Sequence, residues 1–236
     1  MLKKFANFVG AYMLPYSNAR VVAPPGRVTA GGGPNIIIAT PRRSGTHVAI
    51  DLILNNIPAY RRRPLYVNLD PMLRNSDKYR DDIDALIAGS GQLVKTHFPF
   101  RNAGNDQYID DIIRASTVIL VHRDVESVIR SLRNWQANAT RGNLVVAETE
   151  MLRQEYQDFW DYWQARADHV VDFGDLFHPE GIEGLLVRCG RDPACVEKIR
   201  TPPPKTARMR IYANKALTRL LGKHAPQIDT SIFTGQ

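Results

Sequence analysis

The segment PRRSGT, residues 41–46, combines residue types that bind anions. Its arginines carry fixed positive charge, its hydroxyl side chains can donate hydrogen bonds, and its glycine lets the backbone come close to a ligand. The residues concerned are Arg42, Arg43, Ser44, Gly45 and Thr46. If a helix begins directly after them, its first backbone N–H groups add further donors. The segment therefore predicts an anion site, and a basic surface turn that binds nothing is the alternative.

The segments on either side of this loop predict how it is positioned. Asn35–Thr40 (NIIIAT) is a short apolar run rich in isoleucine, which is typical of a buried parallel strand. His47–Asn56 (HVAIDLILNN) predicts a helix that ends before Pro58. The loop would then lie where a strand gives way to a helix. It is not the nucleotide-binding loop G-x-x-x-x-G-K-[ST], because the first glycine and the lysine of that motif are missing.

The rest of the chain alternates between predicted strands and helices. The further strands are Gln92–Thr96, Thr117–His122 and His169–Phe173. The helices are Ser76–Ala88, Asn105–Arg114, Asp124–Trp135 with Asp124 as its N-cap, Val145–Ala167, and two more between Glu180 and Leu221. This alternation predicts an α/β fold, a three-layer sandwich with a central, mainly parallel sheet. Ligands bind beyond the carboxyl ends of the strands in such sheets, so the loops after Thr40, Thr96 and His122 are the candidate site.

Length, composition and charge limit the class of protein. The chain has 236 residues, of which 44% are hydrophobic and 23% charged, as in a globular protein with a buried core. We expect an N-terminal helix and a Pro/Gly-rich loop over residues 1–34, followed by one domain over residues 35–236. The formal net charge of +7 favours anionic partners without choosing among them. No apolar run reaches about 18 residues, so we expect no membrane span. With only Cys189 and Cys195, we expect reduced thiols and a cytoplasmic location.

Three segments taken together resemble the sulfotransferase family. PRRSGT is similar to the 5′-phosphosulfate loop of these enzymes, and Lys95–Pro99 (KTHFP) looks like the K-T-H-x-P element that carries their catalytic histidine. Arg123 at the end of the TVILVH strand, with Ser131 eight residues later, resembles the family's 3′-phosphate motif. The stretch HVVDFGDLF is similar to a late strand and turn of the family. The resemblance covers roughly residues 35 to 178 and implies a P-loop-NTPase-like topology.

The resemblance implies transfer of a sulfuryl group from 3′-phosphoadenosine 5′-phosphosulfate to a hydroxyl or amine of a small-molecule or glycan acceptor. His97 would be the general base, and Lys95 and Arg43 would stabilise charge during the transfer. Arg123 and Ser131 would hold the 3′-phosphate. The 5′-phosphosulfate would be held by the first loop and the helix start, through Arg42, Arg43, Ser44, Gly45, Thr46 and His47. No metal is implied, because the transferred group carries a single negative charge.

The first loop departs from the family pattern at three points. It is one residue longer than usual, so either Arg42 or Arg43 could take the place of the usual lysine, and Arg43 is favoured because it directly precedes Ser44. His47 stands where a second threonine is usual. Val48 stands where a tryptophan usually stacks on the adenine ring.

The sequence leaves two other functions open. One is a nucleotide or small-molecule kinase with a modified P-loop, which the missing lysine opposes. The other is a non-enzymatic nucleic-acid-binding module that uses the net charge of +7, although no recognition motif supports it and we expect no nucleic-acid partner. The usual C-terminal basic segment of sulfotransferases is absent, and Lys205–Arg210 (KTARMR) is the nearest candidate for its role. The acceptor and the oligomeric state are not encoded in any motif.

Overall fold

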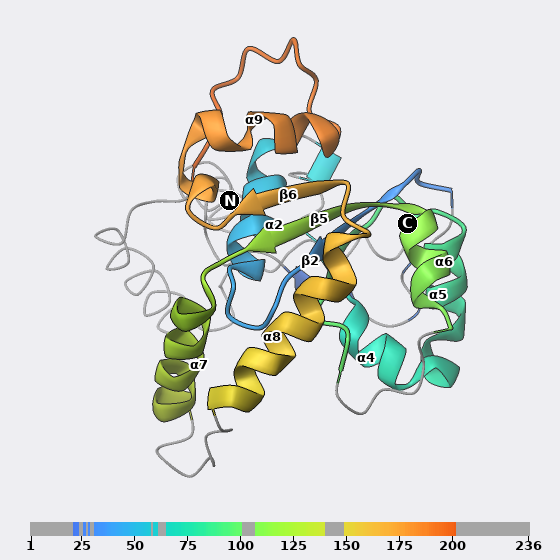
Figure 1. The fold of residues 1–236 in the computed structure, drawn as a ribbon. Helices are drawn as coiled ribbons and strands as arrows, with labels where there is room; N and C mark the ends of the chain where they lie inside the picture. The colour runs from blue at the N-terminus through green and yellow to red at the C-terminus, as the bar shows by residue number, and fades with distance from the viewer. Residues whose placement is uncertain are drawn as a thin grey trace, which may run out of the picture.

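The computed structural model describes residues 21–23, 26, 28, 31–57, 59–60, 65–100, 107–139 and 149–201 of the chain. These residues form a six-stranded sheet with helices on both faces (Figure 1). The strands are β1 (Val21–Val22), β2 (Asn35–Ala39), β3 (Leu65–Asn68), β4 (Leu93–Thr96), β5 (Ser116–His122) and β6 (His169–Asp172). Their order across the sheet is β1-β3-β4-β2-β5-β6, and every neighbouring pair is parallel. The predicted α/β fold with a mainly parallel sheet is confirmed.

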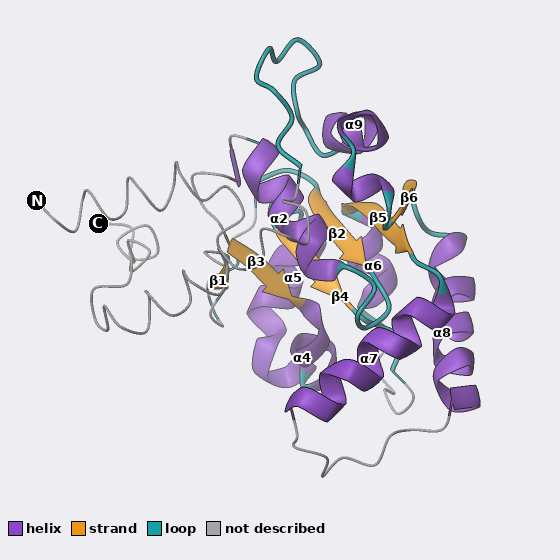
Figure 2. Ribbon diagram, turned by 90° about the vertical axis from the view of Figure 1, so that its left-hand side faces the viewer, coloured by secondary structure: helices purple, strands orange, loops and turns teal. Residues whose placement is uncertain are grey.

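The helices pack in two layers, one on each face of the sheet (Figure 2). The layer on one face consists of α2 (Thr46–Asn56) and α9 (Pro179–Arg188). The layer on the other face consists of α4 (Leu69–Arg74), α5 (Arg80–Ile87), α6 (Ile109–Arg114) and α8 (Thr149–Gln164). The remaining elements are α7 (Val125–Ala139), which packs beside α8, and the 3-10 turns η1 (Ser76–Tyr79) and η2 (Asp175–Phe177). The predicted three-layer sandwich is therefore confirmed.

Strand β2 explains why a short isoleucine-rich run lies at the centre of the sheet. Its side chains alternate between the two cores, as the two-residue period of a strand requires. Ile37 and Ala39 pack under α4, α5, α6 and α8, whereas Ile36 and Ile38 pack under α2 and α9. A strand that is covered on both faces needs apolar side chains at both odd and even positions, and NIIIA supplies them.

The sequence does not predict β1, β3 or α4, and it merges η1 with α5 into one helix over Ser76–Ala88. Strand β1 has two residues and β3 has four, which is too short for a two-residue period to stand out. The remaining predicted strands and helices that fall on described residues are found with shifted ends. The predicted N-terminal helix at the start of residues 1–34, the later helix predicted towards Leu221 and the segment Lys205–Arg210 lie outside the described residues.

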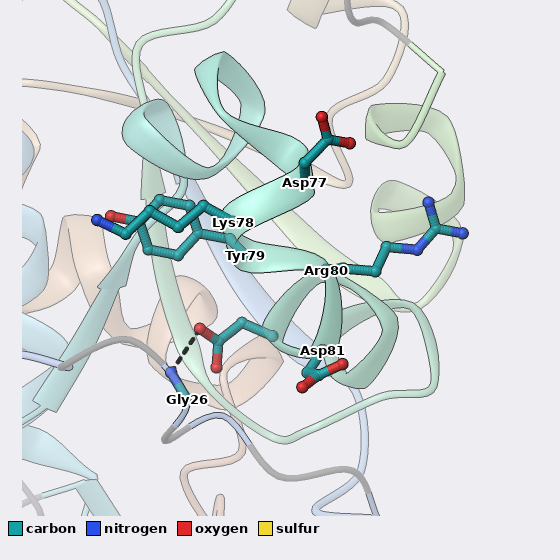
Figure 3. Close-up of a pocket in the computed structure, with 7 residues that line it drawn as sticks. Gly26, Asp77, Lys78, Tyr79, Arg80 and Asp81 are labelled. Atoms are coloured by element: carbon teal, nitrogen blue, oxygen red, sulfur yellow. Dashed lines mark hydrogen bonds between the residues drawn. The ribbon is translucent and has the colours of Figure 1, made fainter.

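Residues before the predicted domain boundary at residue 34 add to the same sheet and core. Strand β1 pairs with β3, and Val28 is buried in the core under α5. The buried carboxylate of Asp82 accepts hydrogen bonds from the backbone N–H groups of Gly26, at 2.8 Å, and Val28, at 3.1 Å. Figure 3 shows the first of these bonds beside the side chains of η1 and the start of α5. Of the described helices, none is both long enough and apolar enough to cross a membrane.

The order of the strands brings the three predicted site loops together. Strand β2 lies between β4 and β5, and Ala39 pairs with Thr96 on one side and with Leu120 on the other. Because all three strands are parallel, their carboxyl ends meet at one edge of the sheet. We call this edge the carboxyl edge and the opposite one the amino edge.

Candidate functional site at the carboxyl edge of the sheet

The loop after β2 contains two residues with left-handed backbone. Arg43 has a φ of 70° and Gly45 a φ of 108°. The Ser44 N–H donates to the carbonyl of Pro41 at 3.2 Å, and Gly45 is the N-cap of α2. The left-handed region costs a residue with a side chain about 1–2 kcal/mol, so the surroundings of Arg43 must hold it there. A turn of this kind before a helix start gathers backbone N–H groups as anion sites do.

Ser44 carries an unusual side chain within this loop. It is 0% exposed, and no described residue forms a hydrogen bond with its Oγ. By contrast, the buried hydroxyl of Thr46 is hydrogen-bonded to that of Thr40. The side chains of Arg42, Arg43 and His47 are exposed. A buried polar atom without a partner costs about 1–3 kcal/mol, so the Ser44 hydroxyl fits a group whose partner is a bound oxygen.

Phe173, in the turn after β6, closes one side of the loop. A Cβ atom on Gly45 would lie 2.4 Å from the Cδ2 atom of Phe173, so glycine is required there by space as well as by its positive φ. The guanidinium of Arg123 lies over the same ring, 4.2 Å from its centroid. Phe173 thus fixes both the helix start and the arginine at the end of β5.

Arg123 connects the ends of β5 and β2. Its Nη1 donates to the Arg43 carbonyl at 2.9 Å, so the structure brings these two predicted site residues together. Burial lowers the pKa of Arg123, and the positive charges of Arg43 and Arg130 lower it further against the opposing effect of Asp124. An arginine stays protonated in spite of such a shift. The consequence is a cluster of like charges that an anion would stabilise.

Ser131 is less directly placed. Helix α7 begins at Val125 after the predicted N-cap, whose carboxylate Oδ2 accepts the Ser127 N–H at 2.8 Å; Asp124 is thus confirmed as the cap. Ser131 is half-buried on this helix, and among the residues that the structure describes no hydrogen bond joins it to Arg123. Its role in phosphate binding stays a prediction.

The carboxylate of Asp70 organises the end of β4. Its Oδ2 lies 2.8 Å from the Lys95 Nζ, and its Oδ1 accepts hydrogen bonds from the Thr96 hydroxyl at 3.2 Å and the His97 N–H at 2.8 Å. The side chains of Lys95 and Asp70 are 10% and 15% exposed. A single carboxylate therefore contacts three consecutive residues of the KTHFP segment.

His97 is held in the form that a general base requires. Its Nδ1 lies 2.7 Å from the carbonyl oxygen of Thr40. A carbonyl only accepts, so Nδ1 carries the proton and the lone pair of the neutral ring is on Nε2. Burial lowers the pKa of His97, Asp70 raises it, and the positive charges of Lys95 and Arg42 lower it. The ring is therefore neutral at pH 7 and can accept a proton.

Helix α8 supports both halves of the site. Its Trp163 is fully buried, and the Trp163 Nε1 donates to the Phe98 carbonyl at 2.5 Å, directly after His97. Its Tyr156 hydroxyl donates to the carbonyl of Arg123. Phe159 and Trp163 also form the core-facing side of this helix.

The structure thus brings His97, Lys95 and Arg123 together around the loop that contains Ser44. Sequence reasoning missed Asp70 and Phe173. Asp70 follows Asn68, whose side chain caps α4 by accepting the Asp70 N–H at 3.3 Å, and this Asn-x-Asp pattern at the end of β3 is the signal that could have pointed to it. Phe173 lies within the stretch that resembles the family's late strand and turn, but nothing local to it indicated contact with Gly45.

No protein-family model matches this chain, and no curated protein matches it in sequence. A functional conclusion therefore depends on the residues and geometry of the carboxyl edge.

Proposed function

We propose that this protein is a sulfotransferase, which moves a sulfuryl group from 3′-phosphoadenosine 5′-phosphosulfate to a hydroxyl or amine of a small-molecule or glycan acceptor. The observation that carries the proposal is the hydrogen bond between His97 Nδ1 and the Thr40 carbonyl. This bond connects a neutral imidazole to Thr40, the residue directly before the PRRSGT loop at the end of β2. A base and an anion site on one edge suit transfer of an anionic group to an acceptor that must lose a proton.

The donor's two ends find complementary groups on this edge. The buried Ser44 hydroxyl, Gly45, Thr46 and the helix start would hold the 5′-phosphosulfate, with Arg42, Arg43 and His47 exposed around it. Arg123 and Ser131 would hold the 3′-phosphate. Arg123 is suited to this role because it is already oriented by the Arg43 carbonyl and the Phe173 ring.

His97 would accept the proton from the acceptor through Nε2 as the acceptor oxygen or nitrogen forms its bond to sulfur. The bond between sulfur and the bridging oxygen breaks at the same time, and its electron pair stays on the 5′-phosphate of the departing nucleotide. Lys95 and Arg43 would stabilise the charge that develops there. The two free cysteines, Cys189 and Cys195, fit the reducing cytoplasm, where we place the protein.

Calorimetry with 3′-phosphoadenosine 5′-phosphate, AMP and ATP tests the proposal. The 3′-phosphorylated ligand should bind more tightly than the other two. Arg123→Ala should weaken its binding by about 1.5–3 kcal/mol, the range for hydrogen bonds to charged groups, and should affect AMP much less. Arg114→Ala is the matched control, because Arg114 pairs with Asp111 on α6. Equal losses for both ligands would overturn the role of Arg123, and preferential binding of ATP with Mg²⁺ would favour a kinase.

A further inference from the structure

We propose that Asp70 is the positioning residue of this site. Its carboxylate holds the Lys95 ammonium and the His97 main chain in one arrangement, and its negative charge offsets the positive charge around His97. The inference rests on the proposed function, because it assigns Lys95 and His97 their roles in the transfer. The sequence analysis did not identify Asp70.

The geometry of Asp70 is specific. One carboxylate oxygen contacts Lys95 at 2.8 Å, and the other accepts the His97 N–H at 2.8 Å and the Thr96 hydroxyl at 3.2 Å. Thr96 in turn accepts the Phe98 N–H at 3.0 Å, so the contact extends to the residue after His97. Four consecutive residues of the KTHFP segment are thereby fixed by one side chain, directly or through Thr96.

Asp70 is itself held firmly. It lies one residue after the start of α4, and the neighbouring side chains of Leu69, Met72 and Leu73 are buried in the core. The Asn68 side chain accepts the Asp70 N–H. A residue anchored in this way can fix its partners in place, because its backbone has little freedom to move.

The charge of Asp70 acts on His97 as well as on Lys95. Among the described residues, the charged groups that act on His97 are Lys95 on β4, Arg42 in the loop after β2 and Asp70 on α4. Burial lowers the pKa of His97 most, and the two cations lower it further, whereas Asp70 and, to a smaller extent, the hydrogen bond to the Thr40 carbonyl raise it. Asp70 therefore keeps the imidazole a stronger base than its burial alone would allow.

These two effects predict opposite changes in binding and turnover when the charge is removed. Asp70→Asn keeps the size and one acceptor oxygen of the side chain but frees Lys95 from its counter-ion. The affinity for the anion 3′-phosphoadenosine 5′-phosphate should stay equal or rise several-fold. The rate of sulfuryl transfer to water, the simplest hydroxyl acceptor, should fall about 10- to 100-fold because His97 becomes a weaker and less well oriented base. A merely structural role would weaken both.

The experiment compares Asp70→Asn with Asp81→Asn, a matched control whose carboxylate is exposed in the first turn of α5. Binding is measured by calorimetry, transfer by release of labelled sulfate, and the titration of His97 by NMR of its ring protons. In Asp70→Asn the His97 titration should move to lower pH, and in Asp81→Asn all three readouts should match the unaltered protein. An unmoved titration, or unchanged turnover, would overturn the proposal.

A second variant keeps the test decisive if Asp70→Asn fails to fold. Lys95→Met removes the cation and leaves the Asp70 charge uncompensated beside His97, so the titration of His97 should move to higher pH. A titration that stays in place or falls would contradict the coupling. If the unaltered protein neither binds the nucleotide nor transfers the sulfuryl group, the proposed function fails, whereas the NMR titrations still decide whether Asp70 controls His97.

Discussion

The two edges of the sheet each bury a polar side chain near an end of β2, with opposite outcomes. At the amino edge, Asn35 is 0% exposed and its amide is well satisfied: Nδ2 donates to the Leu86 carbonyl at 2.8 Å, and Oδ1 accepts the Ser90 hydroxyl at 2.7 Å and N–H at 3.1 Å. At the carboxyl edge, Ser44 is equally buried, and its Oγ has no hydrogen-bond partner among the described residues.

This difference is the one that we expect between a group that holds the fold and a group that serves the proposed ligand. Buried polar atoms are almost always paired, so Asn35 needs no explanation beyond stability. An unpaired buried hydroxyl costs stability and persists where another molecule can complete it. Substitutions at the amino edge should therefore affect unfolding, whereas substitutions at the carboxyl edge should affect binding and turnover.

The largest effect is expected at His97. His97→Ala removes the proposed base and should lower sulfuryl transfer to water by about 10²- to 10⁴-fold, measured as release of labelled sulfate. Binding of 3′-phosphoadenosine 5′-phosphate should barely change. His178→Ala, at an exposed histidine before α9, is the control and should alter neither. Near-normal transfer with collapsed nucleotide binding would show that His97 is a binding or structural residue.

At the amino edge, Asn35→Ala should lower the free energy of unfolding by about 3 kcal/mol, because Ser90 and two carbonyl groups lose buried partners at once. Urea denaturation measures the loss. Asn55→Ala is the control, since the Asn55 side chain donates to the carbonyl of Asp51 one turn earlier on the same helix, and it should cost well under half as much. If Asn35→Ala instead abolished nucleotide binding in a fully stable protein, the contrast between the two edges would be wrong.

Ser44→Ala should have the reverse effect of Asn35→Ala, a loss of affinity without a loss of stability, and the change in free energy should be smaller. Affinity for 3′-phosphoadenosine 5′-phosphate should fall about 10-fold, the lower end for a hydrogen bond to a charged group, as measured by calorimetry. The free energy of unfolding should stay the same or rise slightly, because the variant no longer buries an unpaired hydroxyl. Ser116→Ala, which removes a bond to the Ile112 carbonyl, should lose stability and keep its affinity. A stability loss like that of Asn35→Ala would mean that Ser44 supports the fold.

The smallest expected effect is a pH dependence of stability. Burial holds the pKa of His97 below its ordinary value of 6.5, so near that pH the unfolded chain binds more protons than the native one. The contribution of the buried, neutral His97 to the free energy of unfolding is therefore fully present above pH 6.5 and is lost as the pH falls through the native pKa of His97. Unfolding in urea at pH 8 and at successively lower pH should show this loss, and His97→Ala should lack that part of it. Parallel curves for the two proteins would contradict the buried, neutral histidine.

Local sequence signals predicted the central part of this architecture well. The apolar runs around Ile37 and Ile119 are long enough to identify buried strands, and PRRSGT could be assigned to a strand–helix junction without knowing any partner. The assignment of Lys95 and His97 to the same edge followed from the rule that parallel strands end together.

The unpredicted parts depend on contacts between distant segments. Asp70 contacts Lys95 from 25 residues away in the sequence, and it lies two residues after the end of a four-residue strand that is too short to recognise. Phe173 meets Gly45 across the sheet from β6, and the burial of Ser44 without a partner is a property of the packed loop. Residue type and spacing carry no record of such contacts, because they depend on which strands become neighbours.

Helix α8 has a mechanical consequence. Tyr156 and Trp163 are seven residues apart on one continuous helix, which sets their backbones about 10 Å apart along its axis. The Tyr156 hydroxyl donates to the carbonyl of Arg123, and the Trp163 Nε1 donates to the carbonyl of Phe98. The helix therefore links the end of β5 to the turn after His97. If the end of β5 or the turn after His97 shifts along the helix axis, the other must move with it or one of the two hydrogen bonds must break, so the helix sets the distance between them.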